Sequence, residues 1–183
     1  MIRTSLFGHV HAEYFNVARG VKTGKPINHD IISGSATTFT NKNPSYRVIT
    51  LDQQTMLPVS IKTFYLNISY FNEHPLEEAV FSQLYDFAEE YGIDDLRPSN
   101  VAKVSEAFLT NENMAAKYVD NKRSGRWGVQ TCDENCKKDA YCETFSNIHS
   151  DHVKCKPKKD GMDWLHTIFS TMTEPWMEKI QTP

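Results

Sequence analysis

Two histidines near the start of the chain, His9 and His11, are the residues whose types and spacing point most directly to chemistry. They lie in the run Gly8-His9-Val10-His11, which directly follows a short apolar run. Two imidazoles at i and i+2, just beyond a predicted strand, can offer two neutral nitrogens in one direction, which suits a transition metal. Gly8 is expected to allow a sharp backbone turn and to leave room for an ion. A His-x-His pair alone is more often an ordinary surface or packing pair, so the surrounding sequence must decide.

Four cysteines form the second chemical pattern. They are Cys132, Cys136, Cys142 and Cys155, spaced C-x3-C-x5-C-x12-C within a polar segment. An even number of closely spaced cysteines predicts two disulfides and an oxidising compartment, although four cysteines allow three pairings. The sequon at Asn67 predicts N-glycosylation at a surface turn and agrees with that compartment. The start of the chain lacks the basic and then apolar pattern of a signal peptide, so we expect the natural beginning to lie upstream of Met1.

Composition limits the class of protein. The chain has 183 residues, enough for one large domain or the ends of two, with a formal net charge of −3. The basic residues are dispersed, so we expect no nucleic-acid partner. The small cluster Lys154, Lys156, Lys158 and Lys159 is expected to be a solvated loop. No apolar stretch approaches the ~20 residues that span a bilayer.

The elements that would position these residues change in type along the chain. Alternation and β-branched content predict strands over residues 2–7, 13–18, 27–32, 46–51 and 59–68. Spacing of three to four predicts helices over 76–91, 99–109 with Ser99 as N-cap, 112–122 and 163–172. The apolar stripe of the first helix is expected to face the core, and Trp127, Trp164 and Trp176 are expected to be packing residues. A few strands without a covering layer would leave apolar faces exposed, so their partners are expected upstream of Met1.

Several motifs together resemble one family. Gly8-His9-Val10-His11 is similar to the Gly-His-x-His motif that metal-dependent phosphoesterases carry after one of their last catalytic strands. The runs Ser35-Ala36-Thr37-Thr38-Phe39 and Asn43-Pro44-Ser45-Tyr46-Arg47-Val48, the sequon and the cysteine spacing narrow the resemblance to the C-terminal portion of acid sphingomyelinases. The resemblance covers nearly the whole chain and is weakest over 156–183. Ser45 and Phe39 depart from it, because the family usually has a glycine and a tyrosine there.

The resemblance implies a fold and an activity. The fold would be α+β, with the last strands of a metallophosphoesterase β-sandwich in residues 1–71 and a small disulfide-linked helical C-terminal domain in 72–183. The parent enzyme would use two zinc ions to hydrolyse sphingomyelin to ceramide and phosphocholine. It would be secreted or lysosomal, and regions outside this chain could contact a lipid surface.

The resemblance also implies roles for individual residues. His9 would bind one zinc and His11 the other, while Phe39 would line the substrate site without the tyrosine hydroxyl. The disulfides would join Cys132 to Cys136 and Cys142 to Cys155, and Asn67 would carry a glycan.

The same family needs an Asp-x-His, a bridging aspartate, an Asn-His pair and a further histidine, all earlier in its chain. None has a counterpart here, so we expect the isolated chain neither to hold the dinuclear centre nor to hydrolyse phosphodiesters. Asn28-His29-Asp30 is expected to be an ordinary turn or strand entry. Glu13, Asp30 and Asp52 are expected to be solvated turn or strand residues.

Three alternatives remain open. The four cysteines with His149 or His152 could form a zinc knuckle, although C-x3-C and H-x2-H are not the usual spacings. The parent could be a nucleotide phosphodiesterase of the same branch. The chain could instead be a non-catalytic, secreted, disulfide-linked binding module.

Overall fold

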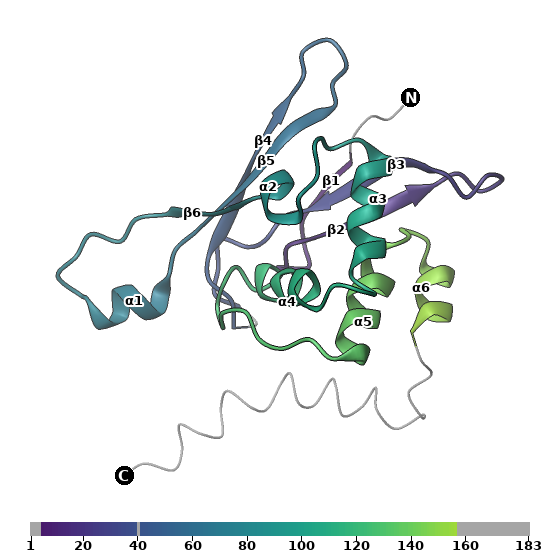
Figure 1. Cartoon of the computed structure of the whole chain (residues 1–183). Helices are drawn as coiled ribbons and strands as arrows, with labels where there is room; N and C mark the ends of the chain where they lie inside the picture. Colours follow the sequence, from purple (N-terminus) through teal and green to yellow (C-terminus); the bar gives the residue numbers. More distant parts are fainter. Residues whose placement is uncertain (1–4, 40, 157–183) are drawn as a thin grey trace.

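Two three-stranded sheets and several short helices form the part of the chain that the computed structural model describes, residues 5–39 and 41–156 (Figure 1). The strands are β1 (Ser5–Phe7), β2 (Tyr14–Arg19), β3 (Pro26–Ile32), β4 (Ser45–Leu51), β5 (Pro58–Tyr65) and β6 (Ser82–Asp86). The helices are α1 (Ile68–Glu73), α2 (Phe87–Tyr91), α3 (Pro98–Ala107), α4 (Glu112–Asn121), α5 (Glu134–Thr144) and α6 (His149–Cys155). The fold is therefore mixed α+β.

The first sheet has the order β1-β3-β2 and carries the histidine loop between β1 and β2. β1 pairs with β3 in parallel, whereas β2 and β3 are antiparallel, with Phe15 opposite Ile31 and Val17 opposite His29. Alternate β2 side chains point into the core, which is the period that the sequence predicts. In the described residues the predicted strands at 13–18 and 27–32 are confirmed, and the first strand occupies Ser5–Phe7.

The second sheet, β4-β5-β6, contains the main error of the sequence analysis. The predicted strands at 46–51 and 59–68 are present, but the second ends at Tyr65. The helix predicted over 76–91 is wrong, because β6 pairs antiparallel with β5, with Tyr85 opposite Thr63. Only α2 remains of that helix. Its N-cap, Asp86, accepts a hydrogen bond from the Ala88 amide at 3.0 Å, and Gly92 ends it with a left-handed φ of 63°.

Tertiary pairing explains this error. The apolar side chains of β6 and α2 recur at nearly helical spacing, but the extended β6 satisfies its backbone groups on β5. The predicted stripe consists of Leu76, Val80, Leu84, Phe87 and Tyr91. Phe87 and Tyr91 are buried as the stripe predicts and Leu84 is partly buried against the core, while Leu76 is fully exposed and Val80 is mostly exposed. The prediction that the stripe faces the core is therefore wrong at its first two positions.

The helices after residue 92 cover the first sheet. α3 packs on β3 and β2, and α5 packs on β2. α4 begins at Asn111, whose side chain accepts from the Met114 amide, as a normal N-cap does. α3 begins with Pro98 in its first turn, so Ser99 lies inside the helix and the predicted N-cap is wrong. α5 and α6 were not predicted.

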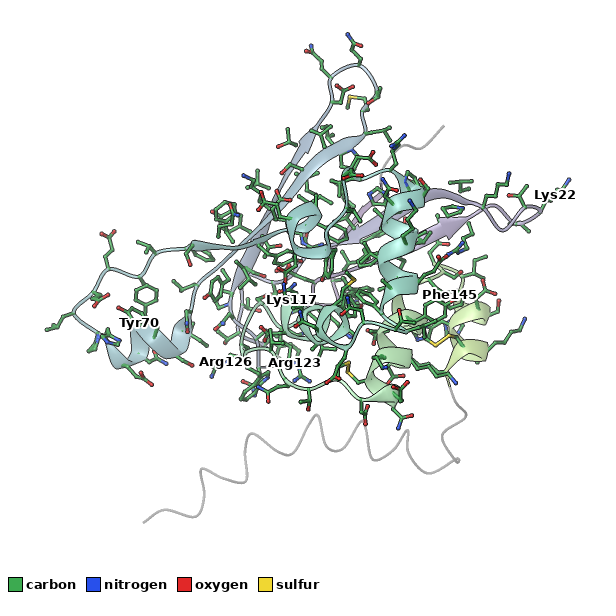
Figure 2. All side chains as sticks on the ribbon, viewed as in Figure 1. Lys22, Tyr70, Lys117, Arg123, Arg126 and Phe145 are labelled. Atoms are coloured by element: carbon green, nitrogen blue, oxygen red, sulfur yellow. A yellow bond between two sulfur atoms is a disulfide. The ribbon has the colours of Figure 1, made fainter. Side chains whose placement is uncertain are left out.

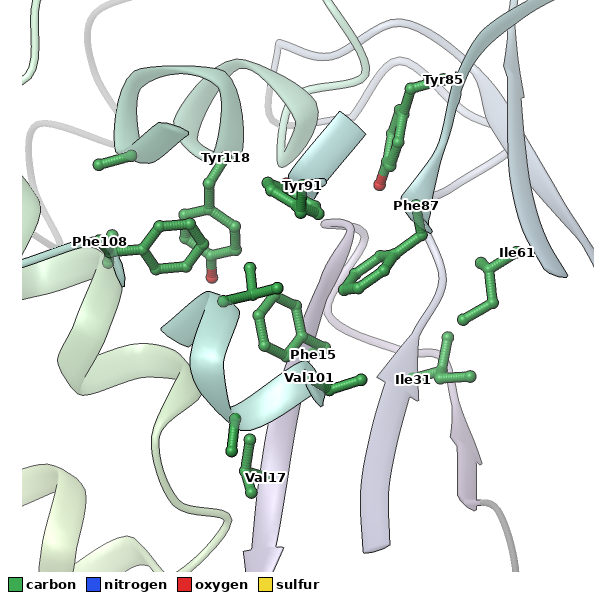
Figure 3. Close-up of a cluster of buried hydrophobic side chains, with 14 of the residues drawn as sticks. Phe15, Val17, Ile31, Ile61, Tyr85, Phe87, Tyr91, Val101, Phe108 and Tyr118 are labelled. Atoms are coloured by element: carbon green, nitrogen blue, oxygen red, sulfur yellow. The ribbon is translucent and has the colours of Figure 1, made fainter. Parts of the chain in front are cut away.

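One buried cluster joins the sheets to the helices. Phe15 of β2 lies at its centre, with ring centroids 5.2 Å from Phe87, 6.1 Å from Tyr118 and 6.3 Å from Phe108 (Figure 3). Such edge-on and tilted ring contacts stabilise a core beyond the area they bury. The cluster draws on residues from both sides of the predicted boundary at 71–72, which itself stays a prediction.

Other parts extend from this body. The β4–β5 hairpin and α1, which carries Tyr70, project away from it, as does the β2–β3 hairpin with Lys22 near its tip (Figures 1 and 2). Trp127 is half-exposed, and the Arg126 guanidinium lies 5.5 Å from its ring centroid. The prediction that Trp127 is a core packing residue is therefore wrong. No helix within residues 5–39 and 41–156 is long and apolar enough to cross a membrane. The predicted helix at 163–172, Trp164, Trp176, Lys158 and Lys159 lie outside the described residues.

Candidate functional site

The histidine loop runs from Gly8 to Glu13 and connects β1 to β2. His9 is exposed and His11 is partly buried. Both have left-handed backbones, with φ of 78° at His9 and 56° at His11. Residues other than glycine rarely adopt this conformation, and where they do a function is a reasonable hypothesis. The loop therefore places strain on the two residues that the sequence selects as ligands.

The sharp turn predicted at Gly8 does not require a glycine there, and the room that Gly8 would leave for an ion stays a prediction. The φ of Gly8 is not left-handed, and a Cβ added there would meet nothing within 4 Å. The sharp turn instead involves the hydrogen bond from the Val10 amide to the Gly8 carbonyl, at 3.1 Å, and the left-handed backbones of the histidines. The position near this loop where a side chain would clash is Gly34, described below.

Residues 35–39 pack against the histidine loop. The Ser35 hydroxyl lies 3.4 Å from His11 Nδ1 and 2.8 Å from the Thr37 hydroxyl. The Phe39 ring meets the His11 ring edge-on, with centroids 5.7 Å apart. The structure thus brings together His11 and Phe39, which the sequence proposes as metal ligand and substrate-lining residue, and adds Ser35 between them. An Nδ1 that faces a hydroxyl leaves Nε2 as the nitrogen that can bind an ion.

Directly behind this loop lies a buried polar cluster that the sequence analysis missed. Glu13 is buried, with its backbone amide bonded to the Lys122 carbonyl at 3.3 Å. Its Oε2 atom lies 3.1 Å from Arg47 Nη2 and accepts from the hydroxyls of Thr63 at 2.8 Å and Tyr85 at 3.2 Å. Oε1 accepts from the Ser124 hydroxyl at 3.3 Å. We call these residues the Glu13 cluster.

Arg47 connects the two sheets within the Glu13 cluster. Besides Glu13, it donates to the Ile32 carbonyl at 2.9 Å and to the Tyr85 hydroxyl at 2.7 Å. Burial disfavours its charge, but Tyr85 and Glu13 outweigh burial and raise the pKa of Arg47. Burial is also the main cause that raises the pKa of Tyr85 to about 12, so Tyr85 stays a neutral donor. The Arg47–Glu13 pair is thus buried, and both side chains have several hydrogen-bond partners.

Gly34 permits this cluster to close. A Cβ there would lie 2.9 Å from Glu13 Cγ and closer still to the Ser45 hydroxyl. The Ser45 amide also donates to the Ser35 carbonyl at 2.8 Å. Glu13 therefore fixes the end of the histidine loop, and Ser45, which accepts from the Ser124 hydroxyl of the Glu13 cluster at 2.8 Å, fixes the segment that carries Ser35.

The described residues contain no group of three or more His, Cys, Asp or Glu side chains that could hold a metal ion. His9 and His11 thus remain the two candidate metal ligands, and the described residues place no carboxylate beside them that could bridge two ions. The prediction that Glu13 and Asp30 are solvated is wrong, because both are buried. Asp52 is a turn residue as expected, and the hydroxyl and amide of Thr55 lower the pKa of its carboxyl.

Asn28-His29-Asp30 lies in the middle of β3, not at its entry. His29 is buried, and neither of its ring nitrogens has a hydrogen-bond partner among the described residues. Burial is the main cause that lowers the pKa of His29 to about 4. His29 is therefore a neutral core residue rather than a ligand or a general acid.

The cysteines are paired as the resemblance implies. Disulfides join Cys132 to Cys136 and Cys142 to Cys155, which leaves no free cysteine for a zinc knuckle. That alternative is therefore wrong. Asn67 caps α1 through its side-chain oxygen, which accepts from the Tyr70 amide at 3.2 Å. Glycosylation at Asn67 stays a prediction.

Comparison with known proteins identifies relatives of this chain. A family model described as the acid sphingomyelin phosphodiesterase C-terminal region matches residues 27–161. Sphingomyelin phosphodiesterase A of Dictyostelium discoideum is 32% identical over 151 residues, which cover 82% of this chain and 25% of the relative. Sphingomyelin phosphodiesterase 1 of Caenorhabditis elegans is 29% identical over 159 residues, which cover 84% of this chain and 27% of the relative. The chain thus spans about a quarter of the length of these curated relatives.

Proposed function

Because the chain belongs to the family of acid sphingomyelin phosphodiesterase C-terminal regions, we propose that it is the C-terminal part of a zinc-dependent enzyme that hydrolyses sphingomyelin. The products would be ceramide and phosphocholine. The names of the relatives favour sphingomyelin over the nucleotide substrate that the sequence left open. The two disulfides support the expectation of a secreted or lysosomal protein.

The observation that carries this proposal is the convergence of His11, Ser35 and Phe39 at one loop. His9 and His11 would each present a neutral imidazole to one zinc ion, and Ser35 would orient the ring of His11. Zinc, when bound, supplies a Lewis acid for the phosphate oxygens and lowers the pKa of a water molecule. The Phe39 ring, which is 69% exposed, would contact the substrate.

Two imidazoles fit part of a dinuclear centre, since such centres also need carboxylate ligands. We propose that the remaining ligands come from the part of the enzyme that corresponds to the other three quarters of the relatives. In the β-sandwich arrangement that the family resemblance implies, those residues would lie beside the edge strand β1. The isolated chain would then have no phosphodiesterase activity of its own.

The isolated chain provides the first test. The zinc-loaded protein is incubated with bis-nitrophenyl phosphate, together with the His9→Ala variant and a matched control, His74→Ala, which removes a histidine from outside the loop. We expect no turnover by any of them. Turnover by the wild-type chain that His9→Ala abolishes and His74→Ala retains would contradict the proposal that the site is incomplete.

A further inference from the structure

A groove of about 410 Å³ lies on the side of the first sheet that faces α5 and α6. Its floor includes Tyr14 at the start of β2, and its walls come from the end of α4 and from α5 and α6. Figure 1 shows these helices beside each other below β2 and β3, and Figure 2 labels Phe145, which follows the last residue of α5. Ala12 of the histidine loop lines this groove, but neither His9, nor His11, nor the side chains of the Glu13 cluster do.

The groove holds more positive than negative side chains. Lys122 and Lys156 face one carboxylate, Glu143, with Lys122 Nζ 2.6 Å and Lys156 Nζ 3.7 Å from its oxygens. One carboxylate cannot neutralise two ammonium groups, so these three side chains leave one positive charge in the groove. Each ammonium has three donors and retains some for a further acceptor.

Two histidines of α6, His149 and His152, also line the groove. His152 Nδ1 lies 2.9 Å from the Cys142 carbonyl, so Nδ1 must carry a proton and donate it. The ring is thereby held with Nε2 free to meet a ligand. Tyr14 adds a hydroxyl, and burial followed by Glu143 raises its pKa, so it stays a donor.

The Cys142–Cys155 disulfide holds this arrangement together. It joins α6 to α5, and Lys156 directly follows the second cysteine.

The aspartates near the groove have hydrogen-bond partners of their own. Asp30 accepts from Asn147 at 3.0 Å, and Asp151 accepts from the Ser146 hydroxyl at 2.8 Å. The Lys122 ammonium and the His152 ring are thus held by contacts within the chain before any ligand arrives, which lowers the entropy cost of binding.

We propose that this groove is a second binding site, which does not include His9 or His11, and that it takes a phosphate monoester. Lys122, Lys156 and His149 donate to the phosphate oxygens, and His152, whose Nδ1 already donates to the Cys142 carbonyl, donates through Nε2 as an imidazolium. A small organic substituent lies along Tyr14. The site requires no metal, so it does not depend on the function proposed above.

The test uses the full 183-residue chain with its disulfides intact, in EDTA and at constant ionic strength. Amide resonances are followed by NMR during titration with inorganic phosphate and, separately, with phosphocholine. Lys156→Gln and His149→Gln remove donors from the groove. Lys154→Gln is the matched control, because Lys154 is exposed on the same helix and does not line the groove.

We expect saturable shifts around Asn147, His152 and Lys156 with both ligands. Affinity should fall about tenfold in Lys156→Gln, the usual effect of losing a hydrogen bond to a charged group. His149→Gln, which alters an exposed side chain and keeps the fold, should also weaken binding. Lys154→Gln should bind like the wild type. The absence of saturable shifts, binding of phosphate without phosphocholine, or equal losses in Lys154→Gln and Lys156→Gln would each overturn the proposal.

Discussion

Replacement of Arg47 should lower the free energy of unfolding more than replacement of any exposed charged residue. The Arg47 and Glu13 side chains are 2% and 0% exposed, and their atoms lie 3.1 Å apart. Replacement of Arg47 by methionine leaves the Glu13 carboxylate buried without its cation, and it also leaves the Ile32 carbonyl without its donor. Breaking a buried pair in this way costs about 3–5 kcal/mol.

Thermal unfolding followed by circular dichroism measures this cost. For a chain of this size each kcal/mol lowers Tm by about 2–4 °C, so Arg47→Met should lower Tm by about 6–20 °C. The matched control is Arg97→Met, which breaks the exposed pair with Asp95 and should have little effect. The double variant Glu13→Gln with Arg47→Met should lose less than the sum of the single variants, because neither charge is then left alone. A loss in Arg47→Met no larger than in Arg97→Met would refute the reasoning.

Three further predictions concern stability. The pKa of His29 is about 4 in the folded chain against an ordinary 6.5, so as pH falls the unfolded chain binds a proton at His29 before the folded chain does. About 3 kcal/mol of the free energy of unfolding should therefore be lost as pH falls from 6.5 to 4. Urea titrations should show a flatter pH dependence of this free energy for His29→Leu, and an unchanged slope would contradict the prediction. Gly34→Ala should cost about 1–3 kcal/mol because its Cβ would collide with Glu13 and Ser45, whereas Gly8→Ala should fold normally, and equal stabilities would show that the close approach is not real. Replacing both cysteines of the Cys142–Cys155 bond with serine should cost about 3 kcal/mol against about 2 for Cys132–Cys136, because the first bond closes the longer loop; the reverse order would count against this.

Local sequence signals predicted most of the first sheet, α4 and the histidine loop. The alternation in β2 and the helical spacing over 112–122 act within a few residues, so they can be seen without the tertiary structure. The β6 segment could not be assigned in this way, because its extended form depends on pairing with Thr63 and Phe64 of β5. α5 has few apolar residues at helical spacing, and only Asp133, which caps it by accepting from the Cys136 amide at 2.8 Å, was available as a signal.

The site was predicted only in part for the same reason. The motif selected His9 and His11, and the resemblance selected Phe39, but the ring contact between His11 and Phe39 depends on how distant segments fold. Glu13 and Arg47 are charged residues of ordinary spacing, 34 positions apart. Nothing local indicates that they meet in the core, since charged residues are mostly exposed.

Zinc content provides the most direct test of the central claim, that His9 and His11 complete a metal centre with residues outside this chain. The chain is placed in Dictyostelium sphingomyelin phosphodiesterase A in exchange for the segment that it matches. The purified chimaera is then assayed for bound zinc, together with the double variant His9→Ala with His11→Ala and the control His74→Ala. We predict that the chimaera and the control retain zinc, and that the double variant loses it while remaining folded. Full zinc content in the double variant would contradict the account.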